Sequence, residues 1–113
     1  MPATQQPRDI CPAARFQQMI SGKYKLRILW GLKDGWRRYG EVRKGLLTGT
    51  VGTVEIAPRV LSRELKTLFN IGMVERRDHQ RFPLKVEYRL SRKGRSFLPI
   101  IGLIRKWGER HLA

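Results

Sequence analysis

The sequence predicts a mainly α-helical domain of the α+β class, with one small β-hairpin between two helices. Apolar residues recur every three or four positions in several separate segments, which is the spacing of a helix face. Apolar and polar residues alternate at positions 85–90, which is typical of a half-buried strand. A length of 113 residues fits one domain of this kind.

The chain is expected to begin with a flexible arm, residues 1–8, because this stretch contains prolines and glutamines and has little to bury. The folded domain is predicted to span residues 9–113. Its first helix should have Pro12 in the first turn, where the fixed φ of proline suits a helix start. The apolar stripe of this helix consists of Phe16, Met19 and Ile20.

Two short helices are expected next. Ser21 is predicted to cap a helix from Lys23 to about Lys33, and apolar residues on more than one side place that helix in the core. Residues 39–47 are predicted to form a further helix. The β-branched and glycine-rich stretch 48–55 is expected to be an extended or mobile loop.

The best-defined helix covers residues 58–71. Pro58 suits its first turn, and Gly72 suits a left-handed C-terminal cap that glycine adopts without strain. Its apolar face consists of Leu61, Leu65, Leu68 and Phe69, and its polar face consists of Arg59, Ser62, Arg63, Lys66, Thr67 and Asn70. The polar face has cations, hydroxyl groups and an amide but no carboxylate. It therefore suits phosphates and base edges, which offer mostly hydrogen-bond acceptors.

A β-hairpin is predicted from strands at 73–78 and 85–90, joined by a basic tip. Ser91 should cap a last helix that reaches about His111, with a kink near Pro99. This helix carries more apolar residues than a surface helix needs, which predicts contact with a second subunit. The expected dimer interface consists of Phe16, Met19, Phe97, Ile101, Ile104 and Trp107.

The charge of the chain limits the classes of partner. Lys and Arg number 24 against 9 Asp and Glu, which gives a formal net charge of +15 spread along the whole sequence. A folded and strongly basic domain implies a polyanionic partner, and nucleic acid is the usual one. A membrane partner is not expected, because the sequence shows no basic amphipathic anchor, lipidation signal, signal peptide or long apolar run. One cysteine fits a reducing interior, so a cytoplasmic location is expected.

The predicted order of elements is that of a winged helix-turn-helix with flanking N- and C-terminal dimerisation helices. We therefore expect a sequence-specific transcriptional regulator that binds double-stranded DNA. Residues 58–71 would enter the major groove, and the wing, residues 78–85, would lie on the backbone or in the minor groove. The expected DNA contacts are Arg38, Arg59, Val60, Ser62, Arg63, Lys66, Arg77, Arg81 and Lys85. The alternative is a non-specific nucleoid or RNA-binding protein in which charge alone provides the affinity.

An enzyme is not expected, because the nine carboxylates are scattered without the spacing of an acid/base pair. Neither a metal nor a cofactor is expected, since His79, His111 and Cys11 form no metal-ligand pattern. Cys11 has two interpretations: a helix-start residue packed near the dimer helices, or a thiol sensor favoured by the nearby Arg8 and Arg15. Without a second cysteine, a sensor would need an intersubunit bond or a small-thiol adduct.

Short motifs also occur in a distinctive order along the chain. They are Cys11-Pro12 and the segments 21–25, 28–30, 38–42, 58–65, 72–76, 86–88 and 105–110. In these motifs the chain resembles the HxlR-type winged-helix transcriptional regulators of bacteria and archaea. The resemblance implies a homodimer on a pseudo-palindromic operator, with the first and last helices at the dimer interface. It also implies that the cysteine matching Cys11 senses electrophiles or oxidants in some members.

The chain departs from the pattern of this family at three places. The link before the helix at 58–71 is longer, with residues 49–55 inserted. Ala57 stands where a capping serine is usual, and a lost cap costs about 1 kcal/mol. Tyr24 replaces the more frequent tryptophan.

Overall fold

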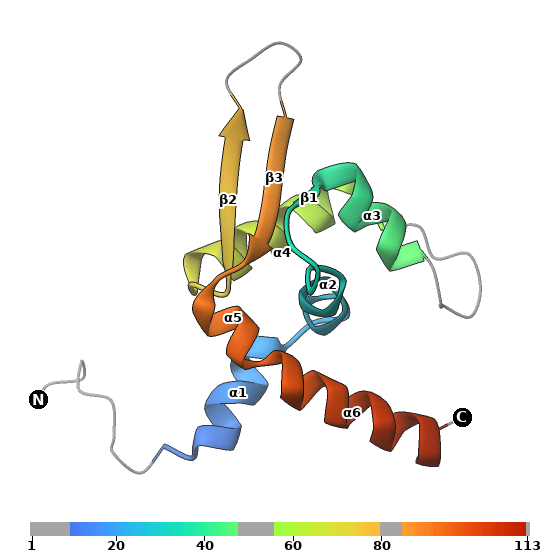
Figure 1. Cartoon of the computed structure of the whole chain (residues 1–113). Helices are drawn as coiled ribbons and strands as arrows, with labels where there is room; N and C mark the ends of the chain where they lie inside the picture. The colour runs from blue at the N-terminus through green and yellow to red at the C-terminus, as the bar shows by residue number, and fades with distance from the viewer. Residues whose placement is uncertain (1–9, 48–55, 80–84, 113) are drawn as a thin grey trace, which may run out of the picture.

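The computed structural model describes residues 10–47, 56–79 and 85–112. The helices gather around α2 and the base of a small sheet, and the β2–β3 hairpin projects away from them (Figure 1). The elements are α1 (Pro12–Ile20), α2 (Lys25–Gly31), β1 (Arg37–Arg38), α3 (Tyr39–Leu47), α4 (Pro58–Asn70), β2 (Val74–His79), β3 (Lys85–Leu90), α5 (Arg92–Ser96) and α6 (Leu98–His111). The predicted arm 1–8 and loop 48–55, with most of the hairpin tip, lie outside the described residues.

One apolar core joins the helices to the sheet. It takes Leu61, Leu65 and Leu68 from α4, all fully buried, and Ile28 and Leu29 from α2. Burial of each such side chain contributes about 1.5–3 kcal/mol. The predicted central position of the second helix is confirmed, although α2 is shorter than the sequence suggested.

The break between the first two helices is longer than predicted. Ser21 does not cap the second helix, because its hydroxyl donates to the Gln18 carbonyl at 2.9 Å and closes α1 instead. Gly22 has a φ of +108°, a backbone conformation that other residues rarely adopt. The chain therefore turns at this glycine before α2 begins at Lys25.

Pro58 and Gly72, from which the ends of α4 were predicted, lie at those ends in the structure. Pro58 occupies the first turn, and Ala57 before it provides no side-chain capping bond. Gly72 follows the helix with a φ of +80°, and the amide of Met73 donates to the Leu68 carbonyl at 2.9 Å. The helix ends at Asn70, one residue before the predicted end.

The sheet has three antiparallel strands in the order β1–β3–β2, whereas the sequence predicted only a two-stranded hairpin. The added strand, β1, consists of Arg37 and Arg38, which pair with Tyr88 and Glu87 of β3. A strand of two residues has no alternation from which it could be predicted. The strand predicted at 85–90 is confirmed.

The single C-terminal helix that was predicted is in fact two helices. Ser91 caps the first, as expected, because its Oγ accepts from the Gly94 amide at 3.0 Å. A Cβ at Gly94 would collide with the Met73 carbonyl oxygen, so glycine is required at this close approach. A second helix, α6, follows Phe97 and has Pro99 in its first turn, where a helix tolerates proline.

Candidate nucleic-acid interface

The exposed face of α4 carries positive charge without a neutralising carboxylate. Arg59, Ser62, Arg63 and Lys66 are exposed, and Val60 is half-buried beside them. Within the described part of the chain, the three cations have no ion-pair partner. We call these five residues the cationic face of α4. Because its charges are unpaired, this face can interact directly with an external polyanion.

A buried ion pair holds the middle of α4 against the start of α2. Lys25 Nζ lies 2.9 Å from Glu64 Oε2, and the two side chains are only 9% and 11% exposed. The same ammonium donates to the Ser21 carbonyl at 2.8 Å. At the beginning of α4, the Tyr39 hydroxyl donates to the Pro58 carbonyl at 2.8 Å. These contacts orient the cationic face relative to the rest of the fold.

Sequence reasoning did not identify the Lys25–Glu64 pair. Two signals for it were present in the sequence. Lys25 is a charged residue at the start of a mainly apolar helix, and Glu64 is the single carboxylate of α4. Buried charges are nearly always paired. A lysine and a glutamate that each lie on a helix facing the same core are therefore predicted to form an ion pair.

One face of the hairpin is neutralised by its own carboxylates. Arg77 donates from Nη2 to Glu87 Oε1 at 2.8 Å, and His79 lies against the same oxygen. Arg89 donates in the same way to Glu75 across the two strands. Hydrogen bonds from Arg77 first, and then from His79, hold the pKa of Glu87 below its ordinary value of 4.5.

Trp36 fixes the same face from the segment before β1. The Arg77 guanidinium lies 4.1 Å from the centre of the Trp36 ring, and that of Arg89 lies 4.5 Å from it. Both distances are within the range of a cation–π interaction. Arg77 was predicted to contact DNA, but the structure shows it bound within the protein by Glu87 and Trp36. The paired face of the hairpin is our name for Glu75, Arg77, His79, Glu87 and Arg89, together with Trp36.

Arg76 lies on the opposite face of the hairpin from Arg77. In the strand register Arg76 pairs with Tyr88 and Arg77 with Glu87, and successive side chains of a strand point to opposite faces. Arg76 forms an exposed ion pair with Asp78, in which Nη2 lies 3.5 Å from Oδ2. Arg76 and Tyr88 line a groove of about 340 Å³ together with Ser62 and Lys66 of α4. The sequence did not single out Arg76, because only the strand register and the packing of α4 separate two adjacent arginines.

The remaining predicted DNA contacts are less closely grouped. Arg38 and Lys85 are exposed. The backbone amide of Arg38 donates to Glu41 at 2.9 Å, while Lys85 stands opposite His79 in the hairpin. Arg81 lies outside the described residues. These three remain predictions.

The predicted dimer interface contains two residues that belong to the core of one chain. Phe97 is 7% exposed and Ile101 is fully buried, so neither can face a second subunit, and this part of the prediction is wrong. The reason is that α6 has two apolar stripes, and the stripe with Ile101 packs inward. Phe16 and Met19 are half-buried against the same core, with the Phe16 and Phe97 rings 5.3 Å apart.

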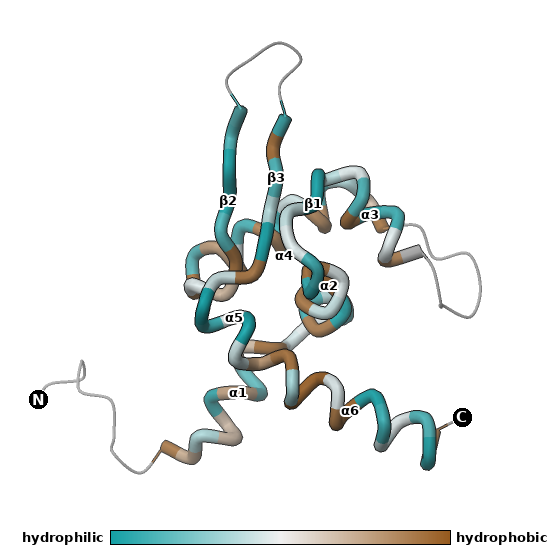
Figure 2. The backbone as a smooth tube through the Cα atoms, in the orientation of Figure 1, coloured by the Kyte–Doolittle hydropathy of each residue, from teal (hydrophilic) through white to brown (hydrophobic). Residues whose placement is uncertain are grey.

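The outer stripe of α6 is exposed and apolar. Ile104 and Trp107, which were predicted at the dimer interface, lie on it at 40% and 57% exposure, together with Ile100 and Leu103. Figure 2 shows the contrast between the hydrophobic first turns of α6 and β2, which is hydrophilic over most of its length. We call Ile100, Leu103, Ile104 and Trp107 the outer stripe of α6.

Cys11 is exposed and its thiol is free, directly before α1. In the described segments, no three His, Cys, Asp or Glu residues come together as metal ligands would. Nor do those segments contain a helix with the length and apolar character needed to span a membrane.

Helices α3 and α4, followed by the β2–β3 hairpin, define a winged helix-turn-helix protein. Residues 19–113 match the family model of the HxlR-like helix-turn-helix, and the chain belongs to this family. The family expectation drawn from the sequence motifs is thereby confirmed.

Related proteins and solved structures align with most of the chain. The HTH-type transcriptional regulator YdzF of Bacillus subtilis (strain 168) is 40% identical over 91 residues, which are 80% of this chain and 77% of YdzF. A structure from Porphyromonas gingivalis W83, assigned to the MarR family of transcriptional regulators, has a TM-score of 0.80 at 30% identity and covers 95% of this chain and 98% of its own. The redox regulator HypR in its reduced form has a TM-score of 0.77 at 31% identity, covering 88% of this chain and 92% of HypR.

Proposed function

We propose that this protein is a sequence-specific DNA-binding transcriptional regulator that acts as a homodimer. The observation that carries the proposal is the cationic face of α4, with its unpaired arginines and lysine on the second helix of a helix-turn-helix. In this class of protein, that helix enters the major groove and its N-terminal residues contact base edges. The transcriptional regulators among its relatives support the same role.

The proposed contacts divide by chemistry. Arg59 and Arg63, near the N-terminal end of α4, would each donate two hydrogen bonds to guanine, and Val60 would make an apolar contact. Ser62 and Lys66 would bind phosphates and fix the register. The further predicted contacts Arg38, Arg81 and Lys85 are proposed as backbone contacts. Arg76 is added to this group, and Arg77 is assigned to support of the wing.

The test is binding of the purified protein to the intergenic DNA beside its own gene, with unrelated DNA as competitor. Arg63→Ala should weaken binding to the specific site by about 1–3 kcal/mol and relax the base preference at one position. Random duplexes should lose much less affinity. An equal loss on both kinds of DNA would show that Arg63 touches only phosphate.

The same assay addresses the second candidate, a non-specific nucleic-acid-binding protein. The net charge of +15 favours that candidate. Binding by charge alone gives one affinity for all duplexes and the same salt dependence for each. A clear preference for the intergenic DNA over the competitor would exclude it.

The homodimer is proposed on the outer stripe of α6, since four exposed apolar side chains on one terminal helix favour burial against a second copy. Phe16 and Met19 would join it at the edge. A two-fold dimer of this kind would bind a pseudo-palindromic operator.

Leu103→Asp tests the dimer, because Leu103 is 65% exposed and a charge there does not disturb the fold of one chain. We expect sedimentation to show a dimer for the wild type and a monomer for the variant, with equal helix content by circular dichroism. Lys106→Asp, at an exposed position of the same helix outside the stripe, should remain a dimer. A monomeric wild type at micromolar concentration would contradict the proposal.

We also propose that Cys11 is a thiol sensor. Its exposure and the likeness of the chain to the redox regulator HypR support this role. Mass spectrometry after oxidant treatment should find a small-thiol adduct or a dimer linked through Cys11, and Cys11→Ser should abolish both. A cytoplasmic location, where thiols are kept reduced, is proposed for the same reason.

A further inference from the structure

The middle of α4 meets the junction of α1 and α2 at a single ammonium group. Lys25 Nζ lies 2.9 Å from Glu64 Oε2 and donates to the Ser21 carbonyl at 2.8 Å. The backbone of Gly22 passes close to both charged atoms, since a Cβ there would lie 3.4 Å from Lys25 Nζ and 3.5 Å from Glu64 Oε2. Three segments of the chain are therefore joined at one point by directional contacts.

Glu64 is the charged member of an otherwise apolar buried face. The other buried residues of α4 are Leu61, Leu65 and Leu68. Apolar burial is non-directional, and apolar cores lose a unique packing arrangement before they lose stability. A hydrogen-bonded ion pair, in contrast, tolerates only a narrow range of distance and angle. On this face of α4, the contact that specifies one rotation of the helix about its axis is therefore the Lys25–Glu64 pair.

The rotation of α4 decides where the proposed base-contacting residues point. Arg63 directly precedes Glu64 and is exposed, so the inward position of Glu64 and the outward position of Arg63 are fixed together. Side chains end about 5–6 Å from a helix axis, so a rotation of roughly 10° moves their ends by about 1 Å. Hydrogen bonds to base edges span only about 2.7–3.2 Å and would break, whereas the attraction to phosphates has a longer range and would persist.

We infer that Lys25 and Glu64 are positioning residues for base recognition. Both are too deeply buried to contact DNA, and they act by holding α4 at the rotation at which Arg59 and Arg63 reach base edges. A buried ion pair is often no more stabilising than apolar residues of similar volume, because both charges lose their hydration. The gain from the pair is therefore one defined orientation of α4. The effect on DNA recognition rests on the proposed function, whereas the effect on α4 does not.

The first test needs no DNA and replaces both charges at once, in Lys25→Met/Glu64→Leu. No buried charge is left without a partner, so we expect the circular dichroism spectrum and the melting temperature of the wild type. NMR relaxation dispersion should then detect microsecond-to-millisecond exchange at the amides of α4, which the wild type should lack. The amides of β2 and β3 should behave alike in both proteins.

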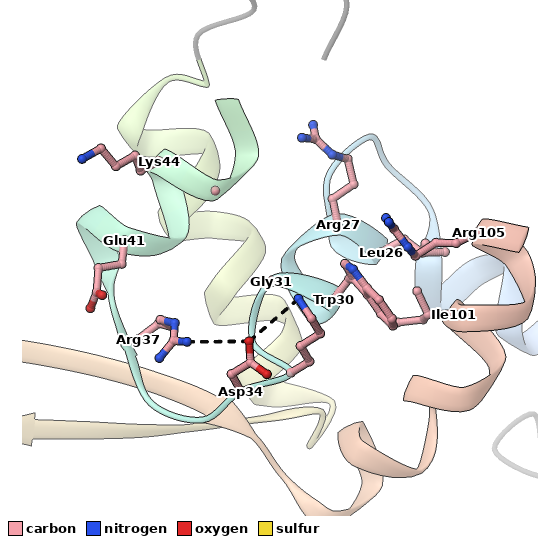
Figure 3. A pocket seen from close by; sticks show the side chains of 12 residues that line it. Leu26, Arg27, Trp30, Gly31, Asp34, Arg37, Glu41, Lys44, Ile101 and Arg105 are labelled. Atoms are coloured by element: carbon pink, nitrogen blue, oxygen red, sulfur yellow. Dashed lines mark ion pairs between the residues drawn. The ribbon is translucent and has the colours of Figure 1, made fainter. Parts of the chain in front are cut away.

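The second test measures the preference for the intergenic DNA over random duplexes. The double variant should lose about tenfold of this preference, as expected for the loss of a base contact. Its affinity for random duplexes should stay within about twofold of the wild type, because the net charge is unchanged. The control is Lys33→Gln/Asp34→Asn, which also removes one lysine and one carboxylate. Asp34 forms exposed ion pairs with Lys33 and Arg37, each at 3.9 Å (Figure 3), and the control should keep the wild-type preference.

Glu64→Gln separates orientation from stability. Its amide oxygen still accepts from the Lys25 ammonium, but the counter-charge is gone. We expect a lower melting temperature than that of the wild type, together with the wild-type preference and no added exchange in α4. A variant that is less stable yet equally selective would show that the preference follows the direction of this hydrogen bond.

Several outcomes would overturn the inference. They are a double variant that does not fold, one with no added exchange in α4, one with the wild-type preference, and a loss of preference in Glu64→Gln or in the control. A wild type without any preference for the intergenic DNA would contradict the proposed function. The exchange measurement, made without DNA, would still decide whether the Lys25–Glu64 pair fixes the rotation of α4.

Discussion

The cationic face of α4 and the paired face of the β2–β3 hairpin are both rich in arginine, yet their charges are in different states. On α4, Arg59 and Arg63 have no carboxylate partner among the described residues, whereas Arg77 on the hairpin is bound by Glu87 and stacked on Trp36. The comparison shows that a basic residue on an element proposed to bind DNA is not automatically available to DNA. Part of the net charge of +15 is used to stiffen the wing.

The difference has a simple physical origin. In the hairpin, the strand register places Glu87 directly opposite Arg77 and Glu75 opposite Arg89, so each arginine meets a carboxylate at short range. In α4 the single carboxylate, Glu64, points inward to Lys25 and leaves the outer face without a negative charge.

The largest effect is expected from breaking the inward pair of α4. Glu64→Ala leaves the Lys25 ammonium buried without a counter-charge, which should lower the free energy of unfolding by about 3–5 kcal/mol. Glu75→Ala, which removes the partner of Arg89 in an exposed pair, should lower it by about 0.2–1 kcal/mol. Urea denaturation at pH 7 measures both. If both variants lost the same free energy of unfolding, the inward pair of α4 would be no more important for stability than an exposed pair of the hairpin.

A smaller effect should separate the two adjacent arginines of β2. Arg76→Ala should weaken binding to operator and random DNA by similar factors and flatten the slope of log K against log salt by about 0.9, the value for one phosphate contact. Arg77→Ala should change the slope much less, because Glu87 at 2.8 Å and the Trp36 ring both hold its guanidinium, whereas Arg76 meets only Asp78, at 3.5 Å. Fluorescence anisotropy over a series of salt concentrations gives both slopes. The reverse order of effects would return Arg77 to the DNA interface.

The smallest effect concerns the pH dependence of the wing. Because the folded protein holds the pKa of Glu87 below 4.5, ionised Glu87 stabilises the fold above that pH, and this contribution is lost as the pH falls through the folded value. The difference in melting temperature between pH 7 and pH 3 should therefore be smaller in Glu87→Gln than in the wild type. Glu109→Gln, at an exposed position of α6, serves as the control and should keep the wild-type difference.

Local patterns in the sequence determined most of the elements. Pro58 and Gly72 marked the two ends of α4, the alternation at 85–90 marked β3, and Ser91 marked the start of α5. Each of these signals acts through the backbone of its own segment, by a fixed φ, a left-handed cap or a side-chain capping bond. Such effects do not depend on distant parts of the chain.

Which residues far apart in the chain contact one another was decided only by the tertiary structure. The helical periodicity of α6 showed that it is apolar on two sides, but packing against the core decided that Ile101 is buried and Trp107 exposed. The pairing of Lys25 with Glu64 joins residues 39 positions apart. Strand alternation alone puts Arg76 and Arg77 on opposite faces, but the packing of the hairpin against α4 decided that Arg76 is the one beside α4. Composition therefore determined that the chain is basic, whereas the fold decided which of its charges are unpaired, because ion pairing depends on distances that only the packed chain sets.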